Sequence, residues 1–285
     1  MLRTINEEDI SIAIDFAWKL SRKPETSSYP LYKEKGKLEE NFKKSFLKDN
    51  SILIGYYKDN ELIAVIQFFF INSEKYIQTT GVYISSNYDE VMSELMHKLK
   101  DDYPDYRVLL GFPKENIEAN NYFIKNNYKC IDSCLDMRLN TNNLKKANSS
   151  ENIFKLSKSD FDSYAPFHDE YFKGSYWTSY RLREEFDNWH VFIYKSKETI
   201  EGSIFITECD ERTIEIFGLS VSDKYKRKGV EEMLLSQALE ELFKLNPLIK
   251  QTIFFIEDCE IEDLNMVQKI GFNYFSSYRC YEVWL

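Results

Sequence analysis

The sequence predicts an α/β protein built from two tandem halves, each a mixed, mostly antiparallel twisted sheet flanked by helices. Its 285 residues, 43% of them hydrophobic, suffice for two ordinary domains. The same order of strand and helix patterns occurs twice, so that Lys125 and Lys269 hold equivalent places. A polar segment without apolar periodicity, residues 141–151, separates the two copies and is interpreted as a linker. We therefore expect domains at residues 1–140 and 152–285.

The first half begins with a short strand and an acidic helix start, which precede an amphipathic helix. A strand pair follows, joined by a turn at residues 58–60. After a further strand comes a helix with one apolar face, formed by Val91, Met92, Leu95, Met96 and Leu99. The expected elements cover, in order, residues 2–9, 10–20, 51–57, 62–71, 77–84, the helix just described, 106–111, a short helix ending at 126–128, and a closing strand at 130–139.

The second half repeats this order with its own residues. Its strand pair turns near Lys197 and Glu198, and its apolar helix face carries Val230, Met233, Leu234, Ala238 and Leu242. The expected elements cover residues 153–160, 161–171, 191–194, 202–207, 213–221, that helix, 251–256, a short helix ending at 270–272, and a closing strand at 274–285. Two α/β segments that are similar only in composition would not be expected to match over so many elements.

Charge and cysteine content restrict the classes of function. The chain has 37 basic and 47 acidic residues, a net charge of −10, which argues against nucleic-acid binding because basic side chains dominate phosphate contacts. The longest apolar run, residues 62–71, contains Gln67 and is too short to cross a membrane. The N-terminal acids Glu7, Glu8 and Asp9 are unlike a secretory signal. Five scattered cysteines fit reduced thiols, so we expect a cytoplasmic protein that holds no metal.

One segment of the second half is typical of an anion-binding loop. A strand ending in Leu219, Ser220 and Val221 is followed by a basic turn, a glycine and a helix start. A helix N-terminus presents unpaired backbone N–H groups, a glycine permits close approach of the backbone or a positive φ, and cations add positive charge. The alternative is a solvated basic turn before an ordinary amphipathic helix. The candidate loop residues are Lys226, Arg227, Lys228, Gly229, Val230 and Glu231.

With the repeated order of elements, this loop resembles the GNAT superfamily of acyl-CoA-dependent N-acyltransferases. There, a strand ending in Val precedes a Q/R-x-x-G-x-G/A loop that binds the pyrophosphate of coenzyme A. Lys226 replaces the usual Gln or Arg, and Glu231 replaces the second small residue. The resemblance implies acetyl-CoA or another acyl-CoA as co-substrate, no metal, and binding of the pantetheine by the strand end at Leu219, Ser220 and Val221.

Glu215 is the candidate catalytic residue. It precedes Val221 by six positions, the spacing at which several members of the superfamily carry a glutamate general base. With a strand period of two, Glu215, Phe217, Leu219 and Val221 are expected on one face. A carboxylate among apolar neighbours has a raised pKa, as a base for an ammonium group needs. The alternative is an exposed glutamate on a strand.

Other family segments are divided between the halves. The second half retains Ile270-Gly-Phe272, but Glu260 and Val267 stand where Asn and the thiolate-protonating Tyr are usual. Tyr274, Tyr278 and Tyr281 follow, and nothing singles one out. The first half retains Asn116, Ala119 and Phe123, but residues 85–89 contain neither glycine nor cation. The resemblance therefore implies a degenerate first copy.

In the superfamily, the region between the first two helices lines the acceptor site, here residues 168–180. Asp169, Tyr176 and Trp177 are the candidate acceptor-binding residues, because aromatic rings and acids together hold a cationic amine. The alternative is an aromatic helix connection used for packing. The expected activity is transfer of an acetyl or short acyl group to a primary amine of a small molecule or peptide. The rival interpretations are a non-catalytic CoA-binding or protein-interaction module and a tandem-GNAT aminoacyl transferase that uses charged tRNA.

Overall fold

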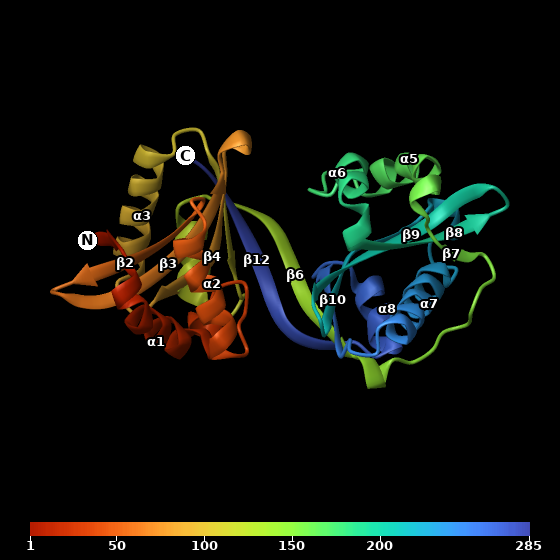
Figure 1. Cartoon of the computed structure of the whole chain (residues 1–285), viewed down its shortest axis with the longest axis horizontal. Helices are drawn as coiled ribbons and strands as arrows, with labels where there is room; N and C mark the ends of the chain where they lie inside the picture. Colours follow the sequence, from red (N-terminus) through yellow and green to blue (C-terminus); the bar gives the residue numbers. More distant parts are fainter. The chain divides into compact units, whose positions relative to one another are not determined.

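The computed structural model describes all 285 residues and divides into two compact units. Unit 1 contains Met1–Cys134 and Ser276–Leu285, and unit 2 contains Leu135–Phe275. Each unit has one mixed sheet with helices on both faces, as the sequence predicts (Figure 1).

Unit 1 has the strand order β1-β2-β3-β4-β5-β12. Neighbouring strands pair antiparallel, except that β4 and β5 run parallel. Its elements are β1 (Leu2–Thr4), η1 (Glu7–Asp9), α1 (Ile10–Ser21), η2 (Pro24–Thr26), α2 (Lys35–Leu47), β2 (Ser51–Lys58), β3 (Glu61–Ile71), η3 (Asn72–Glu74), β4 (Tyr76–Ile84), α3 (Tyr88–Asp102), β5 (Arg107–Phe112), α4 (Ile117–Lys125) and the end of β12 (Asn273–Trp284).

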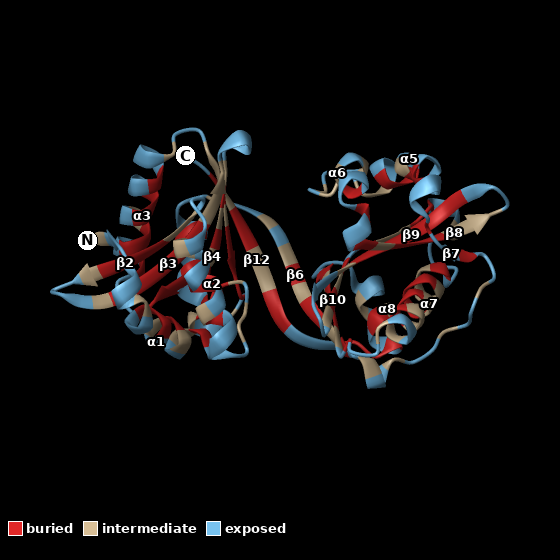
Figure 2. Ribbon diagram, in the orientation of Figure 1, coloured by how far each residue is buried: buried red, intermediate tan, exposed pale blue.

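Two apolar layers hold unit 1 together. On one face of the sheet, Ala13 and Ala17 of α1 and Phe42 of α2 pack with Val65 of β3. On the other face, α3 and α4 pack on the remaining strand residues, with Leu95 among those without exposed surface. The central strands are therefore buried on both sides, as the red bands of Figure 2 show.

Unit 2 has the order β6-β11-β10-β9-β8-β7. Its β7, β8, β9 and β10 pair antiparallel, whereas β10 and β11 run parallel. Its elements are the end of β6 (Lys129–Asn140), η4 (Thr141–Asn143), β7 (Ile153–Lys155), η5 (Lys158–Asp160), α5 (Phe161–Tyr171), α6 (Ser179–Glu184), η6 (Phe186–Asn188), β8 (Trp189–Ser196), β9 (Thr199–Asp210), β10 (Thr213–Val221), η7 (Asp223–Tyr225), α7 (Val230–Leu245), β11 (Gln251–Glu257), α8 (Ile261–Ile270) and the start of β12.

The sheet of unit 2 also separates two cores. Leu234, Leu235 and Leu239 of α7 pack with Ile270 of α8 on one face. On the opposite face, Tyr164 of α5 and Leu182 of α6 pack on β8 and β9. In Figure 1, α5 and α6 lie on one side of this sheet, and α7 and α8 lie on the other.

The two closing strands do not follow the expected contiguous domains at residues 1–140 and 152–285, because each strand is divided between the two units. The last residues of the chain belong to unit 1, where Arg279 to Trp284 pair antiparallel with Phe112 to Arg107 of β5. The end of the other closing strand, residues 135–140 of β6, belongs to unit 2. Both closing strands have 12 residues, and an alternating pattern records which face of a strand is buried but not which sheet the strand joins.

The expected linker, residues 141–151, lies against unit 2. The backbone N–H of Lys145 donates to the carbonyl of Ile270 at 2.8 Å, and that of Ala147 donates to the hydroxyl of Ser236 at 3.0 Å. Lys146 forms an ion pair with Glu240. This polar segment is therefore anchored to α7 and α8 along its length.

Candidate functional site

Strand β10 separates from β11 halfway along its length. The two strands pair in parallel from Thr213 with Gln251 as far as Ile216 with Phe254. On its other edge, β10 stays paired with β9 up to Val221. From residue 217 to 221, the edge of β10 toward β11 has no strand partner, so its backbone N–H and C=O groups are open to a ligand. Leu219, Ser220 and Val221, the residues expected to bind pantetheine, lie in this open stretch.

A β-bulge at Phe217 changes the side-chain alternation of β10. The pairing with β9 shifts between Ile216 and Gly218, which leaves Phe217 as the extra residue. Ile216 and Val221 both lie in the core with α7, and Leu219 packs against that core. Phe217 instead contacts Trp177 and Trp189 on the opposite side. The expectation that Glu215, Phe217, Leu219 and Val221 share one face is therefore wrong, because the bulge reverses the alternation.

The loop after β10 has the backbone geometry of an anion-binding turn. Arg227 has φ +62° and Gly229 has φ +78°, both left-handed. Gly229 precedes α7 without any side-chain cap, so the first N–H groups of the helix, at Val230 and Glu231, have no capping partner. A Cβ at Gly229 would meet no atom within 4 Å. The positive φ, rather than lack of space, explains the glycine.

Each cation of this loop already has a partner in the protein. Lys226 pairs with Asp223 at 2.8 Å, and Arg227 Nε pairs with Glu262 at 2.8 Å. The ammonium of Lys228 lies 5.7 Å from the centre of the Tyr225 ring. Such exposed pairs contribute little to stability. An anion that binds to this loop could therefore exchange these partners at small cost.

Glu201 is a site residue that the sequence analysis missed. This β9 side chain is 4% exposed and accepts hydrogen bonds from Ser222 Oγ at 2.5 Å and from Lys224 Nζ. Burial acts to raise its pKa, but the bonds from Lys224 and Ser222 outweigh burial and hold the pKa below its usual value. Glu201 thus ties the start of the basic turn to the sheet. No sequence pattern distinguishes it from other acids in strands.

Glu231 is half-buried in the first turn of α7. Burial raises the pKa of its carboxyl, Asp263 raises it further, and a hydrogen bond from the backbone of Arg227 acts in the opposite direction. The carboxylate therefore lies at the loop N–H groups that a phosphate would use. An anion bound here must displace or neutralise Glu231.

Glu215 lies on β10, two residues before the bulge, opposite Thr207 of β9. Cys209 Sγ donates to Glu215 Oε2 at 3.5 Å. Burial raises the pKa of this carboxyl to about 7, and the effects of buried Asp136 and of Arg138, which is paired with Asp136, oppose each other. A carboxyl with this pKa is a competent proton acceptor at neutral pH.

A cavity of about 490 Å³ lies beside Phe217, and its lining includes Thr207, the cross-strand partner of Glu215, but not Glu215 itself. Its aromatic lining consists of Trp177, Trp189 and Phe217, with Glu185 and Glu208 among its acidic residues. Of the three expected acceptor-binding residues, only Trp177 lines this cavity. Trp189 and Phe217 were missed because a single aromatic residue at a strand end or bulge has no distinctive spacing.

Asp169 and Tyr176 make other contacts. Asp169 accepts hydrogen bonds from Ser179 N at 3.1 Å and Ser179 Oγ at 2.7 Å, at the start of α6. Tyr176 is 51% exposed, and the guanidinium of Arg181 lies 3.9 Å from its ring centre. Both residues support the segment that carries Trp177, and neither lines the cavity.

A buried chain of hydrogen bonds fixes the position of Trp177. Ser203 Oγ donates to Tyr164 Oη at 3.0 Å, and Tyr164 Oη lies 2.8 Å from His168 Nδ1. His168 Nε2 lies 2.6 Å from the carbonyl oxygen of Trp177, which can only accept, so Nε2 carries the proton and Tyr164 donates to Nδ1. Burial lowers the pKa of His168 and favours this neutral form.

Comparisons with known proteins agree with this geometry. The family model of the acetyltransferase (GNAT) family matches residues 152–272. Residues 152–272 form a GNAT domain. Over 100% of the chain, the fold is similar to a GCN5-related N-acetyltransferase from Sphaerobacter thermophilus, with 12% identity, a TM-score of 0.71 and 95% of that chain covered. It is also similar to a tandem GNAT protein from the clavulanic acid biosynthesis pathway, with 7% identity, a TM-score of 0.63 and coverage of 100% and 98%. No curated protein matches the sequence.

In unit 1, as in the GNAT domain, two parallel strands diverge, but here another segment of unit 1 occupies the space between them. Its β4 and β5 pair in parallel only from Tyr76 to Gln78. Beyond this point, the hydroxyl of Ser28 accepts the N–H of Val82 at 2.6 Å, and the N–H of Tyr29 donates to the carbonyl of Gly111 at 3.0 Å. The side chain of Asn116 donates to the carbonyl of Ser27 at 2.9 Å. Residues 27–29 thus occupy the space between strands that is open in the GNAT domain.

We therefore predict that the protein binds one CoA per chain. The unit 1 loop before α3 keeps a left-handed residue, Asn87, but lacks cations, and Asp89 in its helix start pairs with Lys125 at 2.7 Å. CoA binding also requires open strand edges, and in unit 1 residues 27–29 fill the space between β4 and β5. Calorimetric titration of the full chain with CoA should give a stoichiometry of one. A stoichiometry of two would contradict the assignment of unit 1 as a degenerate copy.

The GNAT domain carries no hydroxyl at the usual position of the thiolate-protonating tyrosine. Val267 lies there, on α8, and is fully buried in the core. Tyr278 and Tyr281 belong to unit 1, where Tyr281 stacks on Phe123 at 4.6 Å and donates to Asn120. Of the three tyrosines considered from the sequence, only Tyr274 belongs to the unit of the GNAT domain, and it is 51% exposed.

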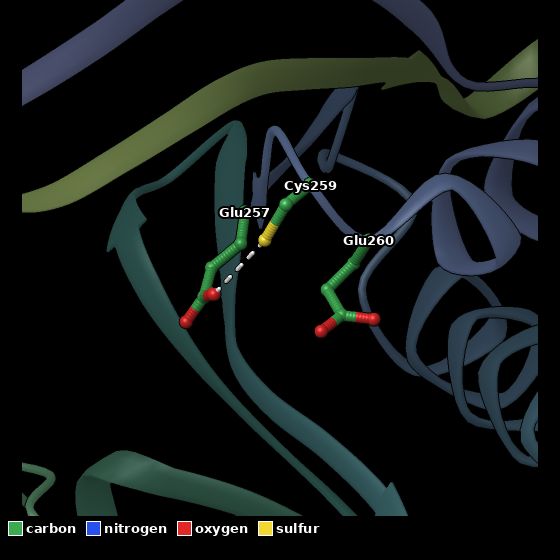
Figure 3. A group of neighbouring side chains, drawn as sticks. All are labelled: Glu257, Cys259 and Glu260. Carbon is green, nitrogen blue, oxygen red and sulfur yellow. Dashed lines mark hydrogen bonds between the residues drawn. The ribbon is translucent and has the colours of Figure 1, made fainter.

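Three neighbouring side chains, at the last residue of β11 and just after it, have metal-ligating atoms close together. These residues, Glu257, Cys259 and Glu260, are all exposed, and Cys259 donates to Glu257 at 3.6 Å (Figure 3). Exposed acidic groups often cluster without an ion, and nothing else at this place points to one. All five cysteines are free thiols. None of the helices is both long and apolar enough to cross a membrane.

Proposed function

We propose that the GNAT domain transfers an acetyl or short acyl group from acyl-CoA to a primary amine of a small molecule or peptide. The observation that carries the proposal is the arrangement along β10. After the C-terminal end of β10, Gly229 precedes the N-terminus of α7, which suits the pyrophosphate. The open strand edge after the bulge suits the pantetheine and its thioester. Glu215, before the bulge, suits the acceptor amine.

The chemistry proposed for this arrangement is direct transfer. Glu215 accepts a proton from the ammonium form of the acceptor, and the free amine attacks the thioester carbonyl carbon. Backbone N–H groups at Leu219–Val221 stabilise the oxyanion that develops. A C–N bond forms, the attacking nitrogen loses its extra proton to solvent, the C–S bond breaks, and CoA leaves as its thiolate. With Val267 at the usual tyrosine position, we assign protonation of the thiolate to solvent.

The test is release of CoA thiol from acetyl-CoA, measured with a thiol reagent across a panel of amines, beside calorimetric CoA binding. Amine-dependent thiol release supports the proposal. CoA binding without turnover on any amine would favour the second candidate, a non-catalytic CoA-binding module. Val267 and the carboxylate of Glu231 in the phosphate loop are the observations that favour that alternative.

The loop assignment makes a prediction about Glu231. Replacing it by glycine restores the family pattern and removes a negative charge from the expected pyrophosphate site, so CoA affinity should stay equal or rise several-fold. Glu232→Gly is the matched control, because it places glycine in the same helical turn. It is expected to leave the CoA affinity unchanged or to lower it slightly. Calorimetry at pH 7.5 measures both. A large loss for Glu231→Gly alone would mean that this carboxylate helps to bind CoA.

A further inference from the structure

The cavity beside Phe217 has the composition of a site for an organic cation. Three rings meet edge-to-face: Trp177 and Trp189 at 4.7 Å, Trp189 and Phe217 at 5.2 Å, and Trp177 and Phe217 at 6.4 Å. Trp189 is 5% exposed and Phe217 is 42% exposed, so the group has a rigid base and an open side. Aromatic faces attract ammonium groups, more strongly where water is partly excluded.

The charges at the rim have the sign that such a ligand requires. Glu185, Asp187 and Glu208 line the cavity, and no lysine or arginine does. Asp187 pairs with the exposed Lys158 at 3.0 Å, and Glu208 Oε1 lies 3.2 Å from His190 Nε2. The carboxylate of Glu185 has no hydrogen-bond or ion-pair partner in the protein. A carboxylate-bearing ligand would be repelled here, whereas an ammonium would be attracted.

The distance along β10 fixes how this cation relates to the reacting amine. Glu215 and Phe217 lie two residues apart on the same face, a separation of about 7 Å in a strand. This is also about the reach of a short alkyl chain between two amines. One ligand can therefore place an amine at Glu215 and a second ammonium against the rings.

We infer that the acceptor is a diamine or polyamine. Its reacting amine lies at Glu215, and its second ammonium binds to Trp177, Trp189, Phe217 and the rim carboxylates. This inference rests on the proposed function and specifies its substrate class. A monoamine of equal length loses the cation–π and charge contacts but keeps the reactive group.

The test compares 1,4-diaminobutane with butylamine and 4-amino-1-butanol, all as acceptors from acetyl-CoA. We expect kcat/KM to be higher for the diamine by about tenfold or more, the size of a partly desolvated cation–π contact. Trp177→Leu and, separately, Glu185→Gln should each lower the preference for the diamine. Glu185→Gln removes charge at an exposed position and so keeps the fold. Tyr180→Leu, a 67% exposed aromatic outside the cavity, is the control and should leave the preference unchanged.

A binding measurement separates this inference from the proposed function. Tryptophan fluorescence of the protein, titrated with 1,4-diaminobutane and with butylamine, should change saturably with the diamine at concentrations about tenfold lower. If thiol release occurs equally with diamine and monoamines, acetyl transfer stands and the inference is overturned. If no amine releases thiol, the proposed function fails. Preferential diamine binding, lost in Glu185→Gln, would then still support the cation site, and its absence would reject it.

Discussion

Glutamine in place of Glu215 should lower kcat by about 100-fold or more, the usual contribution of a positioned general base. The amide has nearly the same shape as the carboxyl but cannot accept the ammonium proton. CoA affinity should not change, because Glu215 lies on the other face of β10 from Leu219 and Val221, before the bulge. Steady-state thiol release and calorimetry with CoA measure the two quantities on the same preparations.

The pH dependence gives the same assignment independently. Burial raises the pKa of Glu215 to about 7, so the wild-type rate should increase with pH, with the midpoint of the increase near that value, as the carboxyl loses its proton. In Glu215→Gln this limb should disappear, and the remaining rate should follow the fraction of free amine, which grows at higher pH. An unchanged limb in the variant would assign that titration to another group.

Stability should respond in the opposite direction from activity. Because the folded-state pKa of Glu215 is above its unfolded value, the folded protein binds more protons, and the carboxyl lowers the free energy of unfolding as pH rises from about 4.5 to about 7. Above pH 7, Glu215→Gln should therefore melt at the same or a higher temperature than the wild type. Glu257→Gln, an exposed acid on β11, is the control and should keep both activity and stability. A variant that is destabilised yet fully active would make Glu215 a structural residue.

Much of this fold could be predicted from the sequence because the decisive signals are local. The repeated order of periodicities predicts two similar α/β units, and the helix of residues 10–20 is confirmed as α1 (Ile10–Ser21). The glycine after three cations predicts a special backbone angle, and Gly229 has φ +78°. Each of these signals depends on a few consecutive residues and on their own conformational preferences.

The rest depends on contacts between distant segments. The bulge at Phe217 is defined by its pairing with β9, and a strict period of two cannot reveal it. The closing strands β6 and β12 have suitable patterns for either sheet, so their division between the units could not be read from residue alternation. Ser28, which lies between β4 and β5, and Glu201, the buried partner of Lys224, are ordinary polar residues. Their roles appear only when the chain is folded.

Valine in place of Gly229 should weaken CoA binding by about tenfold or more, which corresponds to about 1.4 kcal/mol. The left-handed conformation of Gly229 costs a residue with a Cβ about 1–2 kcal/mol, and β-branching adds to this cost. To avoid it, the loop must move, and the N–H groups of Val230 and Glu231 then no longer converge on one anion. Calorimetric titration with CoA measures the change.

The strain of valine at a positive φ must be separated from its effect on the anion site, and Gly174 allows this. Gly174 has φ +80° and, like Gly229, has no atom within 4 Å of a Cβ placed on it. Gly174→Val therefore introduces comparable backbone strain in the same unit but between α5 and α6, away from the start of α7. We expect the two variants to lose similar thermal stability, and only Gly229→Val to lose CoA affinity. Equal affinity losses in both variants would mean that general destabilisation of the unit weakens CoA binding. Unchanged affinity in Gly229→Val would show that the N-terminus of α7 does not hold the pyrophosphate, and the phosphate site would then have to be sought elsewhere along the open edge of β10.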